Sequence, residues 1–298
     1  MILVTGATGF LGEHVVKQFT AAGEKPACFV RSTSDTSSLE KLGLPILHGD
    51  LSDVDSLSRA LECRPTLVNI ASLGFGHAPA IMDACRRSGV KRAIFISTTA
   101  IFTNLEAGSK SVRQAAERCV ESSDLDWTIL RPTMIYGTER DRNMARLVRY
   151  LARFPVIPVI GGGERLQQPV HVEDLAQGIV NSVHCSKAAR RSYNLSGKLP
   201  LTFNQIIDTT AAALARRVLK VHVPMKPVLR LLELYERMVA RPILKAEQVL
   251  RLDEDKAFSH EEAILDFGYT PRTFEEGIRA EVSRLRELGL VRSAGGTT

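Results

Sequence analysis

The chain has 298 residues, a formal net charge of +6, 44% hydrophobic residues and 24% charged residues. These proportions exclude an intrinsically disordered chain and predict a water-soluble globular protein. Five scattered cysteines without a Cys-x-x-Cys pair argue against a zinc site or a disulfide framework. They predict reduced thiols in the cytoplasm and no bound metal. The mild positive charge suits an anionic small molecule and does not demand nucleic acid.

The first twelve residues carry the most informative pattern of the chain. Residues 2–5 have the composition of a buried strand, and glycines follow at positions 6, 9 and 12, where a helix over 10–22 begins. Gly6 permits a tight turn, Gly9 lets the backbone approach a pyrophosphate, and Gly12 lets the helix pack on the strand. Amides at the helix start then face the phosphates, aided by the helix dipole. The segment predicts a dinucleotide site that includes Gly6, Thr8, Gly9, Phe10, Leu11 and Gly12.

Short apolar runs then alternate with helical patterns. The expected strands are 2–5, 27–30, 45–47, 67–70, 93–97 and 128–130, and the expected helices are 10–22, 53–62, 77–88 and 109–122. This alternation predicts an α/β, Rossmann-type doubly wound parallel sheet that binds its ligand at the carboxyl ends of the strands.

The pattern changes near Gly137, which suggests two parts. We expect a dinucleotide-binding core over residues 1–136, to which segments near 165–195 return. Residues 137–292 should form mainly a smaller C-terminal substrate lobe, with short strands near 193–195 and 218–223. Residues 293–298 are expected to be a disordered tail.

The end of the second expected strand bears on the choice of cofactor. It carries Arg31 and Ser32, with no acidic residue before Asp35. An NAD-preferring fold places an Asp or Glu there for the ribose hydroxyls, whereas an arginine fork matches a phosphate. The sequence therefore favours NADP(H) over NAD(H). The alternative is that Arg31 is a solvated surface residue and that Asp35 binds the ribose.

Further cofactor contacts are expected where later strands end. Asp50 could accept a hydrogen bond from the adenine amine, or it could equally cap the helix that begins near Asp53. Backbone after the fourth strand would pass beneath the nicotinamide ribose. Beyond the glycine-rich turn, the expected cofactor contacts are Arg31, Ser32, Asp50, Leu51, Ala71, Ser72, Lys110 and Pro132.

Six motifs occur in a characteristic order. They are TGATGFLG at 5–12, GDL at 49–51, ISTT at 96–99, LRPTMIYG at 130–137, VHVEDLA at 170–176 and FGYTPR at 267–272. Over about residues 1–285 the chain resembles extended or atypical short-chain dehydrogenases/reductases of the NAD-dependent epimerase/dehydratase type. The resemblance implies a nicotinamide cofactor. It also implies chemistry by a Ser or Thr with a Tyr-x-x-x-Lys pair, whose tyrosine transfers a proton as hydride moves.

The catalytic pattern of that family is incomplete here. The stretch 97–99 can supply the hydroxyl that polarises the reacting oxygen, and Lys110 can hold the nicotinamide ribose or donate a proton. Glu106 stands where the family has its tyrosine. Tyr136 is an alternative proton donor, although its motif is usually structural in the family. The expected catalytic residues are Thr98, Thr99, Lys110 and Tyr136.

The reaction stays open between two hypotheses. The first is an NADP-dependent oxidoreductase or epimerase acting on a small carbonyl or sugar-nucleotide-like substrate. Nucleotide-sugar epimerases often carry an arginine at the position of Gln167, however, and only Arg165 is near it. The second is a non-catalytic NADP(H)-binding structural, assembly or redox-sensing protein. Residues 131–137, 141–143 and 168–174 are similar to the NADP(H)-binding accessory subunit of respiratory complex I. An enzyme should have an open polar pocket over the nicotinamide, and a subunit should have that pocket filled by side chains.

Four arginines between residues 142 and 153 form a stripe. Arg142, Arg146, Arg149 and Arg153 fall on one face of an expected helix, opposite an apolar face. The stripe is either a solvated helix face or an anion-binding surface. No aromatic platform is interleaved with it, so we expect no nucleic acid. We also expect no membrane-surface binding, a small and anionic substrate, and a monomer or homodimer.

Overall fold

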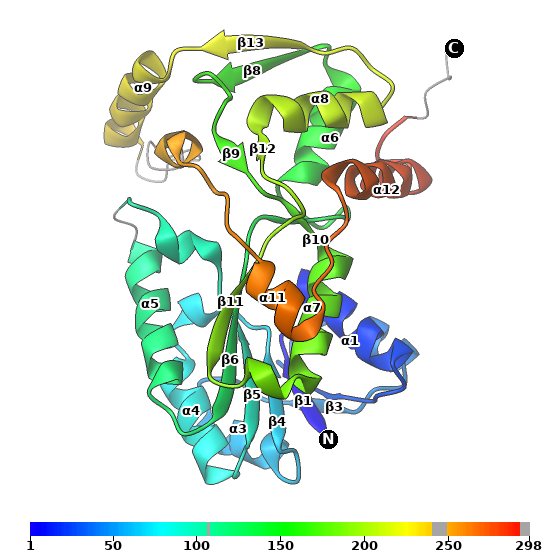
Figure 1. Ribbon diagram of the computed structural model, residues 1–298, viewed down its shortest axis with the longest axis vertical. Helices are drawn as coiled ribbons and strands as arrows, with labels where there is room; N and C mark the ends of the chain where they lie inside the picture. Colours follow the sequence, from blue (N-terminus) through cyan, green and yellow to red (C-terminus); the bar gives the residue numbers. More distant parts are fainter. Residues whose placement is uncertain (106–107, 240–248, 293–298) are drawn as a thin grey trace.

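The computed structural model describes residues 1–105, 108–239 and 249–292. The expected tail 293–298 and Glu106 lie outside the described residues. An α/β core forms one part of the molecule, and a smaller lobe sits at the carboxyl ends of the core strands (Figure 1). No helix in the described ranges combines the length and apolarity needed to cross a membrane.

Seven parallel strands form one sheet in the order β11-β6-β5-β4-β1-β2-β3. Their bounds are β1 Ile2–Thr5, β2 Ala27–Val30, β3 Ile46–His48, β4 Thr66–Asn69, β5 Arg92–Ile96, β6 Asp126–Pro132 and β11 Arg191–Leu195. This confirms the predicted doubly wound sheet. All residues of β1 and β2 are buried, as in a parallel sheet covered on both faces. The strand order reverses between β1 and β4, so a crevice opens above their carboxyl ends.

Helices cover both faces of this sheet (Figure 1). The core helices are α1 Phe10–Ala21, α2 Ser37–Lys41, α3 Val54–Leu61, α4 Ala78–Arg87, α5 Gly108–Glu121, α7 Val172–His184 and α11 Glu261–Phe267. Buried side chains of α1 and α7 form one apolar cluster with the sheet, and those of α3, α4 and α5 form the other. Strand β11 belongs to this core as well, because it pairs with β6 along five residues.

The smaller lobe has an apolar cluster of its own, which includes Leu147, Ile206 and Ile278. Its helices are α6 Met144–Arg153, α8 Phe203–Ala213, α9 Met225–Met238 and α12 Phe274–Glu287. Its strands form three pairs, which are β7 Ile135–Tyr136 with β10 Val170–His171, β8 Val156–Ile160 with β13 Leu219–Val223, and β9 Leu166–Gln167 with β12 Leu201–Thr202. The chain enters this lobe directly after β6, so the end of β6 connects core and lobe.

The motif at 267–272 ties the last lobe helix to the core. The Arg272 backbone N–H donates to Asp174 Oδ2 (2.9 Å), and its guanidinium Nε donates to Oδ1 (2.9 Å). The Tyr269 hydroxyl donates to the Ser196 carbonyl (2.9 Å). The N-cap of α7 is His171, whose ring accepts from the Glu173 N–H (3.4 Å). Asp174 therefore binds the C-terminal segment and is not the cap of its own helix.

A buried carboxyl group makes the lobe sensitive to pH. Glu281 of α12 is fully buried, and burial raises its pKa from the ordinary 4.5 to about 10. The adjacent Asp141 carboxylate contributes to the same shift. Glu281 is thus protonated in the folded protein at neutral pH and ionised in the unfolded chain. Since the unfolded state then binds fewer protons, the free energy of unfolding falls as pH rises from about 4.5 to about 10.

We expect Glu281→Gln to flatten this pH dependence. The amide stays neutral in both states. Between pH 5 and pH 8.5 the wild type should therefore lose roughly 4 to 5 kcal/mol of unfolding free energy that the variant keeps. Urea unfolding at several pH values measures the effect. Glu287→Gln, at an exposed position of the same helix, is the matched control and should leave the pH profile unchanged. Identical profiles for wild type and Glu281→Gln would disprove the assignment.

Candidate functional site

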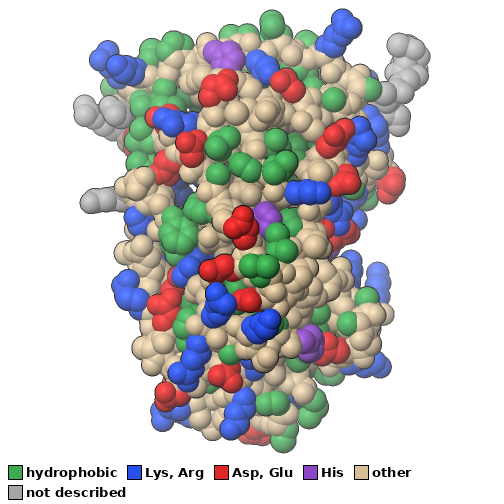
Figure 2. Space-filling model, in the orientation of Figure 1, with side chains coloured by type: hydrophobic (Ala, Val, Ile, Leu, Met, Phe, Trp, Pro, Cys, Tyr) green, Lys and Arg blue, Asp and Glu red, His purple; other side chains and the backbone are tan. Residues whose placement is uncertain are grey.

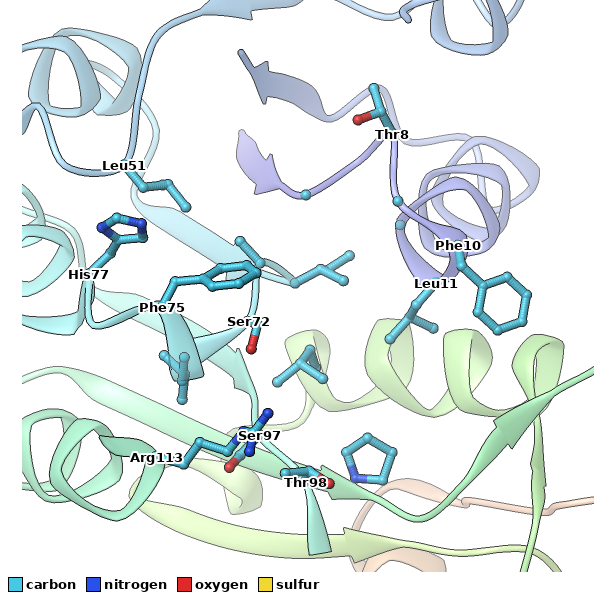
Figure 3. Close-up of a pocket in the computed structure, with 18 of the residues that line it drawn as sticks. Thr8, Phe10, Leu11, Leu51, Ser72, Phe75, His77, Ser97, Thr98 and Arg113 are labelled. Atoms are coloured by element: carbon cyan, nitrogen blue, oxygen red, sulfur yellow. The ribbon is translucent and has the colours of Figure 1, made fainter. Parts of the chain in front are cut away.

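A cleft of about 920 Å³ lies above the carboxyl ends of the core strands. Its walls come from the glycine-rich turn after β1 and from the segments that follow β2 to β6 (Figure 3). Strands β1 to β3 and strands β4 to β6 form the two halves of a dinucleotide fold. The cleft therefore has an adenosine half near β1 to β3 and a nicotinamide half near β4 to β6.

The glycine-rich turn has room only for glycine at two places. Gly6 has φ +70°, and a Cβ there would lie 2.8 Å from the Ala71 backbone nitrogen. A Cβ on Gly12 would lie 2.0 Å from the Gly6 carbonyl oxygen. The start of α1 consequently packs backbone against backbone, with the Gly9 N–H donating to the Gly6 carbonyl (3.0 Å). This turn fits a pyrophosphate, because the α1 N-terminus opens into the cleft without side chains in between.

Most of the expected cofactor contacts border the cleft. They are Gly6, Thr8, Gly9, Phe10, Leu11, Gly12, Arg31, Asp50, Leu51, Ala71, Ser72 and Pro132. Ser32 does not border it, and Ser34 does. The third strand ends at His48, one residue after its expected end, and Asp50 is not a helix cap. The cap of α3 is Asp53, which accepts from the Ser56 N–H (3.1 Å).

Two acidic side chains of the adenosine half differ in their surroundings. The Asp50 carboxylate faces the cleft and accepts from the Ser52 hydroxyl (2.6 Å) and N–H (2.8 Å), which lower its pKa. Asp35 does not border the cleft, and its carboxylate accepts from the Ser37 hydroxyl (2.6 Å) and N–H (3.0 Å). Arg31 is thus the charged side chain at the end of β2 that faces the cleft, and Asp35 is occupied in the following turn.

The nicotinamide half combines hydroxyl groups with a cation. Ser97 and Thr98 border it, and the Ser97 Oγ is buried without a hydrogen-bond partner among the described residues. The Arg113 side chain extends from α5 toward Ser97 (Figure 3). A buried hydroxyl without a partner is costly unless a ligand completes its hydrogen bonding. This end of the cleft therefore suits a polar group that both Ser97 and Arg113 can reach.

Of the four expected catalytic residues, Thr98 alone borders the cleft. The Lys110 ammonium donates to the Thr103 carbonyl. The Thr99 hydroxyl is buried and donates to the Pro132 carbonyl (3.3 Å). Tyr136 is buried in the lobe, edge-on to the His171 ring at 5.4 Å between centroids, and burial raises its pKa. These three side chains make contacts within the protein and do not border the cleft.

Sequence reasoning missed three side chains that face the cleft. Arg113 lies one helical turn after Lys110, and its place on the same face of α5 was a usable signal. Phe75 and His77 follow β4, and Phe75 is 71% exposed at the cleft (Figure 3). An exposed aromatic ring between two glycines after a strand was the available signal for a ligand contact.

A connection between lobe and cofactor turn was also not predicted. Arg140, in the loop before α6, donates to the Thr8 carbonyl (3.2 Å) and forms an ion pair with Glu13 of α1. The pair joins positions more than a hundred residues apart. Arg140 therefore links the lobe to the glycine-rich turn.

Metal and charge patterns add little to the site. Within the described ranges, no group of three or more His, Cys, Asp and Glu side chains is arranged to hold a metal ion. On the face drawn in Figure 2, Lys and Arg side chains alternate with Asp and Glu. The positive net charge is not gathered into a single basic patch on that face.

Comparisons with known proteins agree with this geometry. The chain is 30% identical to the ceramide reductase of Caulobacter vibrioides over 192 residues, 60% of each protein. It is 30% identical to mouse mitochondrial NADH dehydrogenase [ubiquinone] 1 alpha subcomplex subunit 9 over 214 residues, 65% of this chain and 56% of the subunit. The chain thus spans 60% and 56% of the length of these relatives.

The fold has solved counterparts. The Thermus thermophilus UDP-glucose 4-epimerase complex with NAD superposes with a TM-score of 0.72 at 20% identity, covering 96% of this chain and 98% of the epimerase chain. Residues 6–184 match the family described as NAD(P)H-binding. The chain therefore belongs to this NAD(P)H-binding family and shares its Rossmann fold with the epimerase.

Proposed function

We propose that the protein is an NADP(H)-dependent reductase of carbonyl compounds. The open nicotinamide half of the cleft carries this proposal, because Ser97 offers a hydroxyl without a partner there and Arg113 offers a cation. An open polar pocket at this end of the cleft is the feature expected of an enzyme. The similarity to a protein named as a reductase supports the same direction.

The side chains of the cleft suit a reduction without a tyrosine. A reduced nicotinamide supplies hydride to a carbonyl carbon. The Arg113 guanidinium donates hydrogen bonds to the carbonyl oxygen and stabilises the negative charge that develops on it. The Ser97 hydroxyl gives its proton to that oxygen and is reprotonated by water from the cleft. The products are an alcohol and the oxidised cofactor, and the one proton consumed comes from solvent by way of Ser97, so atoms and electrons balance.

The preference for NADP(H) rests on the end of β2. Arg31 faces the cleft, and its planar guanidinium matches the geometry of a phosphate. Asp35 does not border the cleft, and its carboxylate accepts hydrogen bonds from Ser37. A carboxylate in contact with the ribose would have favoured NAD(H). The 2′-phosphate is the group that Arg31 suits best.

A second candidate function is a non-catalytic NADP(H)-binding subunit or assembly protein. Its specific support is that Lys110 and Tyr136 are both turned away from the cleft. The similarity to a respiratory NADH dehydrogenase subunit points the same way. In this function the cofactor would stabilise the fold and would not be consumed.

Calorimetric titration with NADPH, NADH and their oxidised forms, followed by an absorbance assay with a panel of aldehydes and ketones, separates the two. Consumption of NADPH with some carbonyl compound supports the reductase. Tight NADPH binding without consumption favours the subunit. Gly12→Val should abolish binding, because its side chain would meet the Gly6 carbonyl. Gly108→Ala, at a position with open space around it, should keep binding intact.

Arg31→Glu tests the cofactor preference. We expect NADPH affinity to fall about 10- to 100-fold, since a charged hydrogen bond to the 2′-phosphate is lost and a repulsion gained. NADH affinity should change much less. Arg118→Glu, at an exposed site of α5 away from the cleft, controls for the change in net charge. Equal losses for both cofactors would refute the 2′-phosphate contact.

Arg113→Ala tests the charge stabilisation. We expect kcat/KM for the carbonyl substrate to fall about 10²- to 10³-fold, as for the loss of an oxyanion donor. Lys110→Ala should change it by no more than about threefold, because its ammonium is bound to a wall carbonyl. Steady-state kinetics at saturating NADPH measures both. A larger loss for Lys110→Ala would reverse the assignment of the two cations.

A further inference from the structure

A second cavity of about 840 Å³ lies in the smaller lobe, beside the cofactor cleft. Two segments line both spaces. Thr133 and Arg251 border the cofactor cleft, and the residues that follow them, Met134 and Leu252, border the second cavity. The two spaces therefore share a wall formed by the end of β6 and by residues 251–252. A ligand in the second cavity lies directly next to the nicotinamide half.

The inner walls of this cavity are mainly apolar. They are formed by α6, β8 and the first residues of α8 and α9. The apolar side chains on these elements include Met144, Leu147, Ile160, Phe203 and Met225. A volume of this size can hold a ligand of the size of a drug molecule or a medium-length acyl chain. A sugar in these walls would leave hydroxyl groups without partners, which is costly.

The acidic side chains at this cavity already have partners. Asp253 accepts from Arg165 Nε (2.9 Å), and Asp255 accepts from the Leu166 N–H (2.8 Å). Glu164 accepts from Asn204 Nδ2 (2.7 Å). These contacts neutralise or satisfy the negative charges of the rim.

Two arginines of the rim differ from these residues. Arg142 and Arg146 border the cavity and are exposed, and in the described part of the chain no carboxylate lies within 4.0 Å of either guanidinium. Arg146 lies on α6 and Arg142 in the segment just before it, and both border the same cavity, so they can hold one anionic group together. The cavity therefore offers apolar walls inside and unpaired positive charge at its mouth.

We propose, on the basis of the reductase function above, that this cavity binds the chain of an amphipathic substrate, an oxo acid with a long aliphatic tail. The carboxylate pairs with Arg142 and Arg146, the aliphatic chain lies against α6 and β8, and the carbonyl end lies toward Ser97 on the side shared with the cofactor cleft. The cavity thus favours acyl compounds, whose aliphatic chain suits the apolar faces of α6 and β8, over nucleotide sugars.

Titration of the NADPH-loaded protein with dodecanoate tests this inference, with butanoate, dodecanol and UDP-glucose as comparison ligands. We expect dodecanoate to bind at least about tenfold more tightly than each of them, because only it has both the apolar chain and the charge. Arg142→Glu/Arg146→Glu should weaken dodecanoate binding about 10-fold or more and leave NADPH binding unchanged. Arg149→Glu/Arg153→Glu, on the same helix but outside the cavity, is the matched control and should bind dodecanoate like wild type.

The outcomes separate this inference from the proposed function. Reduction of a short carbonyl compound without dodecanoate binding would overturn the inference and leave the reductase. Dodecanoate binding sensitive to Arg142 and Arg146, without reduction of any carbonyl compound, would support the cavity and overturn the reductase. Tighter binding of UDP-glucose, or equal losses in the two double variants, would overturn the acyl site. Melting temperatures of both double variants verify that the fold is kept.

Discussion

The absence of side-chain atoms at Gly6 and Gly12 is the constraint on which the rest of the site depends. The α1 backbone approaches the β1 turn so closely that a single added carbon would meet a carbonyl oxygen at 2.0 Å. Because of this approach, the first amides of α1 open onto the crevice where the strand order reverses. The later segments of the cleft, from Arg31 to Arg113, can contact a dinucleotide only if its phosphates bind at this turn.

The chemistry of the cleft is built on a different set of side chains from that of the usual family pattern. In the proposed reductase, the roles of tyrosine and lysine pass to the hydroxyl of Ser97, which follows β5, and to the guanidinium of Arg113 on α5. Arginine stays charged at any pH at which the protein folds, so it can stabilise negative charge and cannot give up a proton. In the proposed reaction the proton would therefore come from a hydroxyl or from water, for which an open cleft gives access.

The sequence was sufficient for the core and insufficient for the orientation of single side chains. Strands β1 and β2 coincide with the apolar runs at 2–5 and 27–30. Burial on both faces of a parallel sheet leaves this clear pattern in the sequence. The face of α5 could be predicted, but the choice between Lys110 and Arg113, one turn apart on that face, could not, because it depends on contacts such as that of Lys110 with the Thr103 carbonyl. The ties of Arg272 to Asp174 and of Arg140 to Thr8 join distant parts of the chain, and local pattern has no access to them.

The contact of Arg140 with the glycine-rich turn has a consequence for how two ligands affect each other. Arg140 touches the turn that holds the pyrophosphate, and Arg142, two residues later, borders the second cavity. A ligand that displaces this short segment must also change the support of the cofactor turn. By thermodynamic linkage, the factor by which such a ligand alters cofactor affinity equals the factor by which the cofactor alters the affinity for that ligand. The pair with Glu13 is partly exposed, and exposed pairs contribute little to stability, so coupling between the two sites would pass through residues 140–142 without rearrangement of the core.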